Sequence, residues 1–152
     1  GYFQTQVAAA VDVPVTLSAL EQIAWVRRTL KPEQKIAVFS DVNSLTPELF
    51  AACGTPDTSD IVPAHTSGLP ETVRQRELGC INPYRYAQQV AELAHDLLAD
   101  NPDIGAIVAE YTEFPTFAWA VQHEVNVPIY DCTTLTRWVY SGVVRHPFPG
   151  LI

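Results

Sequence analysis

Ile104-Gly-Ala-Ile-Val-Ala-Glu110 is a short apolar run that lies between Asp103 and the polar pair Tyr111-Thr112. Lys35-Ile-Ala-Val-Phe-Ser40 has the same form, and polar residues follow it as well. Short apolar runs with polar ends are typical of strands that are buried on both faces of a parallel sheet. Stretches with apolar residues at helical spacing separate these runs, and such alternation predicts an α/β fold with a doubly wound parallel sheet.

Further elements can be placed around these two strands. We expect additional strands near 12–16 and 127–131, which are rich in β-branched residues. The stretch 55–83 is irregular, with room for one short strand at 60–63, and is a candidate lid or binding loop. Apolar periodicity, caps and stop residues predict helices over about 20–30, 46–54, 84–98, 113–124 and 133–143.

Composition and charge exclude several classes of protein. The 152 residues are 47% hydrophobic and 17% charged, which indicates a globular domain. The net charge of −8 would repel nucleic acid and anionic lipid, so we expect neither as a partner. The apolar runs are far shorter than the roughly 20 residues that a membrane span needs. Three dispersed cysteines give no disulfide framework, so we expect a cytoplasmic protein.

No motif calls for a cofactor or a metal. The sequence has no glycine-rich dinucleotide or phosphate loop, no nucleophile elbow and no cysteine or histidine spacing typical of zinc sites. These absences argue against dinucleotide, P-loop and nucleophile-elbow chemistry. We expect Cys53 and Cys132 to be core residues, and His65 is the one histidine that merits a test.

An internal repeat suggests two related halves. Phe3…Val7…Val11-Asp-Val-Pro-Val15 can be laid over Phe117…Val121…Val125-Asn-Val-Pro-Ile129 without a gap. The second copy has a strand before it and the first has none, and the chain contains no methionine. We therefore expect an N-terminal segment or a second chain to complete the structure. The expected division is a remainder of an N-terminal lobe at 1–33 and 132–152, and a second lobe at 34–131.

Several blocks resemble one enzyme family. Gly105-Ala-Ile-Val-Ala-Glu-Tyr-Thr-Glu-Phe-Pro115 resembles the second active-site segment of aspartate/glutamate and hydantoin racemases. Phe3-Gln4 with Val13-Pro14-Val15 and Ser18, Ser44-Leu-Thr-Pro-Glu48, and Asp131-Cys-Thr-Thr-Leu-Thr-Arg-Trp138 are similar to further blocks of that family. The resemblance implies two pseudosymmetric α/β lobes, one catalytic cysteine from each lobe, proton transfer at the carbon next to a carboxylate or amide carbonyl, and no cofactor.

This chain departs from the family pattern at both cysteines. Tyr111 stands where the second cysteine is expected, and the first would precede Gly1. The chain is then a fragment or half of a split enzyme, an active-site variant, or a binding protein without catalysis. The expected function is that of an isomerase such as an amino-acid or hydantoin racemase. The alternatives are a malonate-type decarboxylase or maleate-type isomerase, and an inactive module that binds small ligands.

The candidate site residues follow from the strand ends and from the resemblance. Tyr111 is the candidate catalytic residue: it could act as an acid, donate a hydrogen bond to the substrate, or be an aromatic residue at the rim with no chemical role. Each candidate substrate-binding residue could instead serve only in a cap or turn: Thr112, Thr16, Ser18, Asn43, Ser44 and Thr133. The expected partners are a small carboxylate or amide substrate and further copies of the chain in a homo-oligomer.

Overall fold

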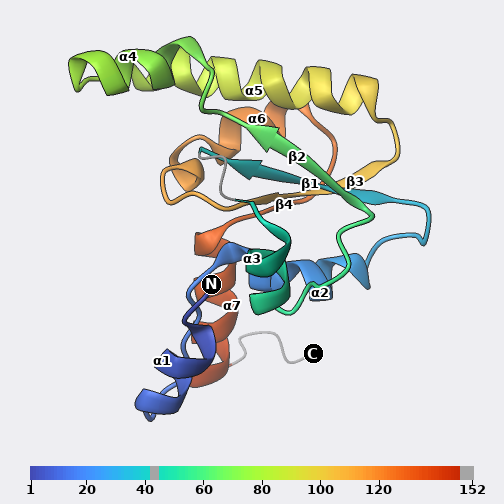
Figure 1. Ribbon diagram of the computed structural model, residues 1–152, viewed down its shortest axis with the longest axis vertical. Helices are drawn as coiled ribbons and strands as arrows, with labels where there is room; N and C mark the ends of the chain where they lie inside the picture. The colour runs from blue at the N-terminus through green and yellow to red at the C-terminus, as the bar shows by residue number, and fades with distance from the viewer. Residues whose placement is uncertain (42–44, 148–152) are drawn as a thin grey trace.

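A four-stranded parallel sheet forms the centre of the computed structural model, which describes residues 1–41 and 45–147. The strand order is β2-β1-β3-β4, and every neighbouring pair is parallel (Figure 1). The predicted parallel α/β fold is confirmed. The strands are β1 (Lys35–Ser40), β2 (Ile61–His65), β3 (Ile104–Ala109) and β4 (Ile129–Tyr130).

Helices cover both faces of this sheet, because the central strands bury side chains on both sides. Phe39 and Ile107 point to one face, where they pack with Val90 and Val121 in a single core cluster. The helices over this face include α5 (Pro83–Asp100) and α6 (Ala118–Glu124), and α4 (Pro70–Leu78) continues their layer (Figure 1).

The opposite face carries the alternate residues of the same strands. Ile36 and Val38 of β1 pack there with Leu20 and Ile23, and all four are fully buried. Burying a side chain of this size contributes roughly 1.5–3 kcal/mol, so this second cluster is a substantial part of the fold's stability. The elements on this face are a 3₁₀ turn, η1 (Ala19–Gln22), and the helices α2 (Ile23–Arg27) and α3 (Pro47–Ala52).

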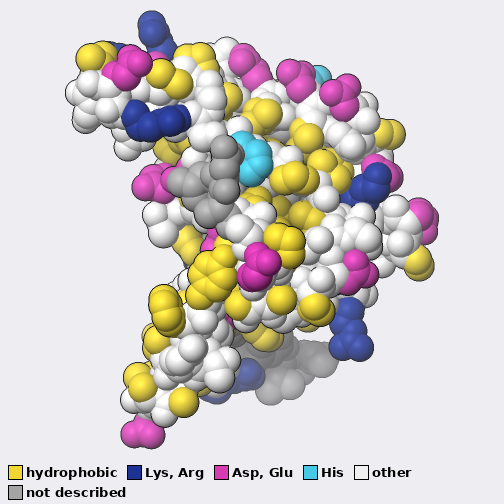
Figure 2. Space-filling view, in the orientation of Figure 1, with side chains coloured by type: hydrophobic (Ala, Val, Ile, Leu, Met, Phe, Trp, Pro, Cys, Tyr) yellow, Lys and Arg dark blue, Asp and Glu magenta, His cyan; other side chains and the backbone are white. Residues whose placement is uncertain are grey.

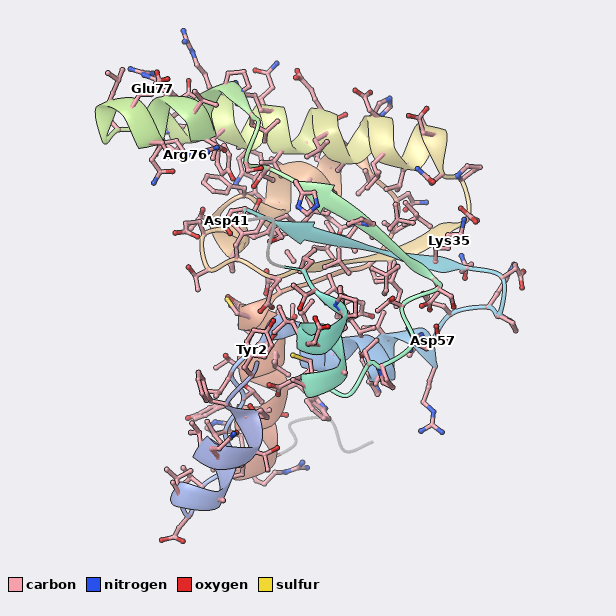
Figure 3. The ribbon with its side chains drawn as sticks, viewed as in Figure 1. Tyr2, Lys35, Asp41, Asp57, Arg76 and Glu77 are labelled. Carbon is pink, nitrogen blue, oxygen red and sulfur yellow. The ribbon has the colours of Figure 1, made fainter. Side chains whose placement is uncertain are left out.

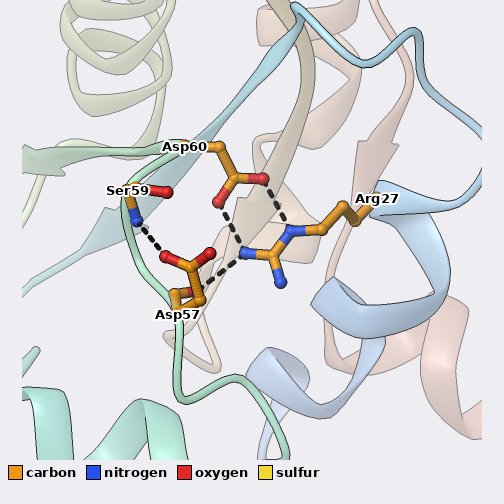
Figure 4. Close-up of polar contacts among 4 residues, drawn as sticks. All are labelled: Arg27, Asp57, Ser59 and Asp60. Atoms are coloured by element: carbon orange, nitrogen blue, oxygen red, sulfur yellow. Dashed lines mark hydrogen bonds and ion pairs between the residues drawn. The ribbon is translucent and has the colours of Figure 1, made fainter.

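Arg27 connects the helical layer of this face to the loop before β2. Its Nε and Nη2 donate to the two carboxylate oxygens of Asp60 at 2.6 and 2.5 Å, and Nη2 also donates to the carbonyl oxygen of Asp57 at 2.9 Å (Figure 4). The Ser59 N–H donates to the Asp57 carboxylate, which closes the loop around the guanidinium. A planar guanidinium that binds both oxygens of one carboxylate fixes the relative orientation of the two groups as well as their distance. The pair of Arg27 and Asp60 therefore holds α2 against the loop before β2.

Three expectations about individual elements need correction or refinement. Residues 12–16 do not form a strand: Asp12 and Val13 lie in bent backbone, Val13 is exposed, and residues 14–16 pair with no strand of the described chain. In the part of the chain that the structure describes, no strand lies beside them to supply hydrogen bonds. The short strand expected at 60–63 is present as β2, and the helix expected over 113–124 is divided into a 3₁₀ turn, η2 (Phe114–Thr116), and α6.

The stretch 55–83 is more regular than the sequence suggested. It contains β2 and the nine residues of α4, which begin at Pro70 with Glu71 in the first turn. Gly79 ends this helix with φ of 66°, a left-handed conformation that glycine adopts at little cost. The sequence did not predict this helix, because most of its side chains are polar and they form no clear apolar stripe.

The helices expected over 20–30, 46–54 and 84–98 are present, within a few residues, as η1 with α2, as α3 and as α5, and the helix expected over 133–143 is α7 (Cys132–Val143). Thr46 caps α3 through a bond from the Leu49 N–H, as predicted. In Figure 1, α1 (Gln4–Ala10) and the lower part of α7 project together beyond the sheet. Among the described helices, none combines the length and the apolar character needed to cross a membrane. The division into lobes at 1–33 with 132–152 and 34–131 stays a prediction.

Candidate functional site

A cavity of about 310 Å³ lies at the carboxyl edge of the sheet. Figure 3 shows that edge by its labelled residues: Lys35 stands at the start of β1 and Asp41 just past its end. Ligands of open α/β sheets bind at this edge, where loops leave the strands. The cavity is lined by the segment before η1, the end of β3 and the start of α7: Thr16, Leu17, Ser18, Ala19, Ala109, Glu110, Tyr111, Thr112, Cys132, Leu135 and Thr136.

Glu110 provides the carboxylate of this cavity. Its Oε1 accepts a hydrogen bond from the Ser18 hydroxyl at 2.7 Å, and its Oε2 accepts one from the Leu20 N–H at 3.2 Å. Burial raises the pKa of Glu110, while the bonds from Ser18 and Leu20 oppose that rise. A half-buried carboxylate with a raised pKa is a stronger base than an exposed one, so Glu110 is suited to accept a proton.

Tyr111 is buried beneath the cavity, and only 6% of its surface is exposed. Its ring packs edge-on against Phe114, with centroids 5.5 Å apart. Burial raises the pKa of Tyr111 well above its ordinary value, and the nearby Tyr86 adds to that rise. The side chain therefore stays protonated, and its catalytic role stays a prediction, restricted to that of a neutral hydrogen-bonding group.

Four of the predicted site residues meet at this cavity, namely Tyr111, Thr112, Thr16 and Ser18. The exposed Thr112 donates its hydroxyl hydrogen to the Glu113 carboxylate at 3.1 Å and does not cap a helix. Thr133 lies next to Cys132 on α7 but is not among the lining residues. Asn43 and Ser44 fall outside the described residues. The substrate-binding role stays a prediction for all six residues to which it was assigned: Thr112, Thr16, Ser18, Asn43, Ser44 and Thr133.

The start of α7 is fixed by a polar network. Asp131 caps the helix by accepting from the Thr134 N–H at 2.8 Å, and the Thr134 hydroxyl accepts from the Asp131 N–H at 2.8 Å. Gln22 donates to the Asp131 carbonyl oxygen at 2.9 Å and accepts from the Thr134 hydroxyl at 3.0 Å. Because these bonds hold α7 to η1, they also position the half-buried thiol of Cys132 on the cavity wall.

A second cavity, of about 380 Å³, adjoins the first and shares Thr16 and Leu135 with it. Its walls are largely aromatic: Trp25 and Tyr130 meet edge to face, with centroids 5.8 Å apart, and Trp138 completes the lining on α7. Together the two cavities offer one polar and one aromatic compartment that meet at two residues.

Sequence reasoning missed Glu110 and Cys132 as cavity residues. Glu110 was noted only as the end of a strand, although a carboxylate directly after a fully apolar strand faces the edge where ligands bind. Cys132 was assigned to the core because Tyr111 occupies the position where the resemblance expects the second cysteine. Within residues 1–41 and 45–147, no group of three or more histidine, cysteine, aspartate or glutamate side chains could hold a metal ion.

The known proteins to which this chain is similar are named as lyases. No family model and no solved structure matches the chain. Two curated relatives are lyases. One is the dimethylsulfoniopropionate lyase of Durusdinium sp. clade D, 26% identical over 166 residues that cover 99% of this chain and 52% of that protein. The other is dimethylsulfoniopropionate lyase 5 of Emiliania huxleyi (strain CCMP1516), 22% identical over 164 residues that cover 98% and 31%.

These matches overturn the functional expectation. The resemblance to aspartate/glutamate racemases is wrong, and so is the expected isomerase activity, because the relatives carry the name of a different enzyme class. The decarboxylase, maleate-isomerase and inactive-module alternatives find no support either. The racemase interpretation rested on short blocks of five to eleven residues, and strand-to-cap segments of that length recur in many α/β proteins. The chain spans about half the length of the Durusdinium relative and about a third of the Emiliania one.

Proposed function

We propose that this chain is the catalytic part, or one portion of it, of a lyase that cleaves dimethylsulfoniopropionate. The observation that carries the proposal is the similarity of nearly the whole chain to two proteins of that name. The cavity at the carboxyl edge of the sheet supports the proposal, because it combines a carboxylate with hydroxyl groups in a space suited to a small molecule.

The substrate's structure defines what such a site must do. Dimethylsulfoniopropionate carries a carboxylate at one end and a dimethylsulfonium group on the carbon two bonds away from it. Elimination removes a proton from the carbon next to the carboxylate. The electrons of that C–H bond form a C=C bond, and the C–S bond breaks with its electrons passing to sulfur. The products are acrylate, neutral dimethyl sulfide and one proton, so no oxidant, reductant or water is consumed.

In this proposal Glu110 is the base that accepts the proton. Its raised pKa makes it a better proton acceptor than an exposed carboxylate, and the Ser18 and Leu20 bonds hold it in one orientation. In this proposal the hydroxyls of Thr16 and Thr112, which also line the cavity, bind the substrate carboxylate, and Thr112 exchanges its bond to Glu113 for one to the substrate. Cys132 is a second candidate base on the same wall.

The test is direct. The chain is incubated with dimethylsulfoniopropionate, dimethyl sulfide is measured in the headspace by gas chromatography, and acrylate is measured in the liquid by proton NMR. The two products must appear in equal amounts and at a rate proportional to protein concentration. The Durusdinium lyase provides the positive control. Failure to form either product from the chain, under conditions where the control is active, contradicts the proposal.

We also propose a cytoplasmic compartment. Cys53, Cys80 and Cys132 are all free thiols, and a reducing environment keeps cysteines in that state. Labelling the protein in intact cells with a thiol-alkylating reagent, followed by mass spectrometry, should find all three cysteines reduced.

A further inference from the structure

The aromatic cavity next to the candidate site has an unusual lining. Trp25 and Trp138 expose 52% and 66% of their surface, although large aromatic side chains are ordinarily placed where they can be covered. Both rings border the cavity together with Tyr130, whose ring stands at 87° to that of Trp25. Two perpendicular rings and a third from α7 therefore line one space, and the two tryptophan rings are accessible to a ligand there.

The charge of this cavity is negative. Glu21 is its one charged lining residue, and the others are Thr16, Gln22, Trp25, Tyr130, Thr134, Leu135 and Trp138. Glu21 Oε1 accepts a hydrogen bond from the Leu17 N–H at 3.2 Å, which orients the carboxylate. Across the described ranges, no lysine, arginine or histidine forms an ion pair with it. Its charge is therefore free to attract a cation from solution.

The buried polar groups in the lining of this cavity already have hydrogen-bond partners. Gln22 is buried and uses both ends of its amide, donating to the Asp131 carbonyl oxygen and accepting from the Thr134 hydroxyl. Because these groups already bond within the protein, they contribute little to the binding of a cation that enters the cavity. Its attraction must come from the aromatic rings and from Glu21.

We propose that this cavity binds a small methylated onium cation, the class that includes dimethylsulfonium and trimethylammonium groups. Such cations hydrate weakly because their charge is spread over methyl groups, and aromatic faces with a nearby carboxylate attract them. The aromatic cavity shares Thr16 and Leu135 with the cavity that holds Glu110. A zwitterion with an onium group at one end and a carboxylate at the other would thus occupy both.

The choice of dimethylsulfoniopropionate as this zwitterion rests on the proposed function, whereas the onium site itself does not. The first experiment therefore uses trimethylsulfonium ion, which has no carboxylate and cannot undergo the elimination. It is titrated into the chain and binding is followed by isothermal calorimetry. We expect saturable binding that weakens about tenfold in Trp138→Leu and in Glu21→Gln, since a desolvated cation–π contact or a charge contact is worth about one factor of ten.

Trp119→Leu is the matched control. Trp119 is also 66% exposed, but it lies on α6 in a different cavity. Far-UV circular dichroism and thermal melting establish that the three variants are folded, which is expected because Glu21 lies at the surface and both tryptophans are largely exposed. Equal affinity of the parent and the Trp138 and Glu21 variants for trimethylsulfonium, or no binding to the parent, would overturn the proposal.

A second comparison determines whether the site recognises the positive charge and whether it prefers a sulfonium or an ammonium group. Dimethylsulfoniopropionate, glycine betaine and 4-methylpentanoate are titrated separately; the last replaces the sulfonium by an uncharged branched carbon of similar shape. Weaker binding of 4-methylpentanoate than of the two zwitterions supports recognition of the charge, and equal binding contradicts it. Tighter binding of glycine betaine than of dimethylsulfoniopropionate would show that the site favours the ammonium source.

The two proposals fail in distinguishable ways. If the onium site is correct and the lyase function is wrong, trimethylsulfonium binds through Trp138 and Glu21 but dimethyl sulfide is not released. If the lyase function is correct and the onium site is wrong, dimethyl sulfide is released and neither substitution changes KM. If both are correct, each substitution raises KM about tenfold and leaves kcat nearly unchanged, as expected for uniform binding of substrate and transition state.

Discussion

Glu110 combines two properties that ordinarily oppose each other. The Ser18 and Leu20 bonds stabilise its charged form, and burial destabilises it. Burial is the larger effect, so the pKa of Glu110 is raised and the side chain binds a proton more readily than a surface glutamate does. The hydrogen bonds then serve mainly to direct the carboxylate toward the cavity.

Replacing Glu110 tests its proposed role as the base. Glu110→Gln keeps the shape and an oxygen that accepts the Leu20 bond, but it cannot take a proton. We expect release of dimethyl sulfide to fall by roughly 10²–10⁴-fold, the usual contribution of a positioned general base. In the parent, the rate should rise with pH through the raised pKa of Glu110, because only the ionised carboxylate acts as a base.

Cys132→Ser is the matched control for that substitution, since Cys132 lines the same cavity. It should change the rate far less than Glu110→Gln does. A larger loss in Cys132→Ser would assign the base to the thiol instead of the carboxylate. Initial rates of acrylate formation, measured for both variants over a pH series, decide between the two residues.

The raised pKa of Glu110 also has a consequence for stability. Because its pKa is higher in the folded than in the unfolded chain, the folded state binds more protons over the interval between the two values. The contribution of Glu110 to the free energy of unfolding therefore falls as pH rises through that interval, which starts near the unfolded value of about 4.3. Urea denaturation across acidic to neutral pH should show the stability of Glu110→Gln increasing relative to the parent. A constant difference would contradict the raised pKa.

At the scale of elements, the cap of α7 connects the fold to both cavities. Asp131 is buried and accepts from the Thr134 N–H, and the first turn of this helix carries Cys132 and Leu135 to the cavity walls. We expect Asp131→Ala to lower the free energy of unfolding by about 0.5–2 kcal/mol, the cost of removing a capping side chain. Urea denaturation measures this loss.

The control for Asp131 is the cap of a distant helix. Asn82 caps α5 by accepting from the N–H groups of Tyr84 and Arg85, at a place that touches neither cavity. Asn82→Ala should lower stability by a similar amount and leave the affinity for trimethylsulfonium unchanged, whereas Asp131→Ala should weaken both. If Asp131→Ala keeps full affinity, the cap does not position the cavity walls.

The elements that could be predicted were those whose signals are local. The strands β1 and β3 stand out because both faces of each are apolar, and α3 stands out because Thr46 and Pro47 mark its start. The failed strand at 12–16 has equally good β-branched residues, but a strand also needs a neighbour to bond to, and the sequence does not reveal neighbours. Likewise, the hydrogen bond from Ser18 to Glu110 connects residues that are 92 positions apart in the sequence. It could not be predicted, because it depends on how the chain folds.

The whole molecule has an uneven distribution of exposed apolar surface. Figure 2 shows hydrophobic side chains on the part that projects beyond the sheet, where Figure 1 places α1 and the end of α7. Tyr140 and Val143 of α7 are 56% and 57% exposed, and Val13 is 64% exposed. These three residues border one hollow of about 370 Å³, so they form a connected apolar surface and not scattered side chains.

The homo-oligomer expected from the sequence stays a prediction, and it can be tested at this surface, which a second copy of the chain would then cover. Light scattering coupled to size-exclusion chromatography should then give about twice the 16.8 kDa mass of the chain. Tyr140→Lys combined with Val143→Lys should return the mass to that of one chain, because burying two charges in an apolar contact is costly.

Leu78→Lys with Tyr84→Lys is the control: both parent side chains are more exposed still, yet they lie on α4 and α5, away from the hollow. A parent that runs as a single chain at every concentration would instead leave this surface to other polypeptide, such as the additional length that the curated relatives possess. An assembly that persists in the α7 double variant but dissociates in the control would place the contact on the helices of the opposite layer.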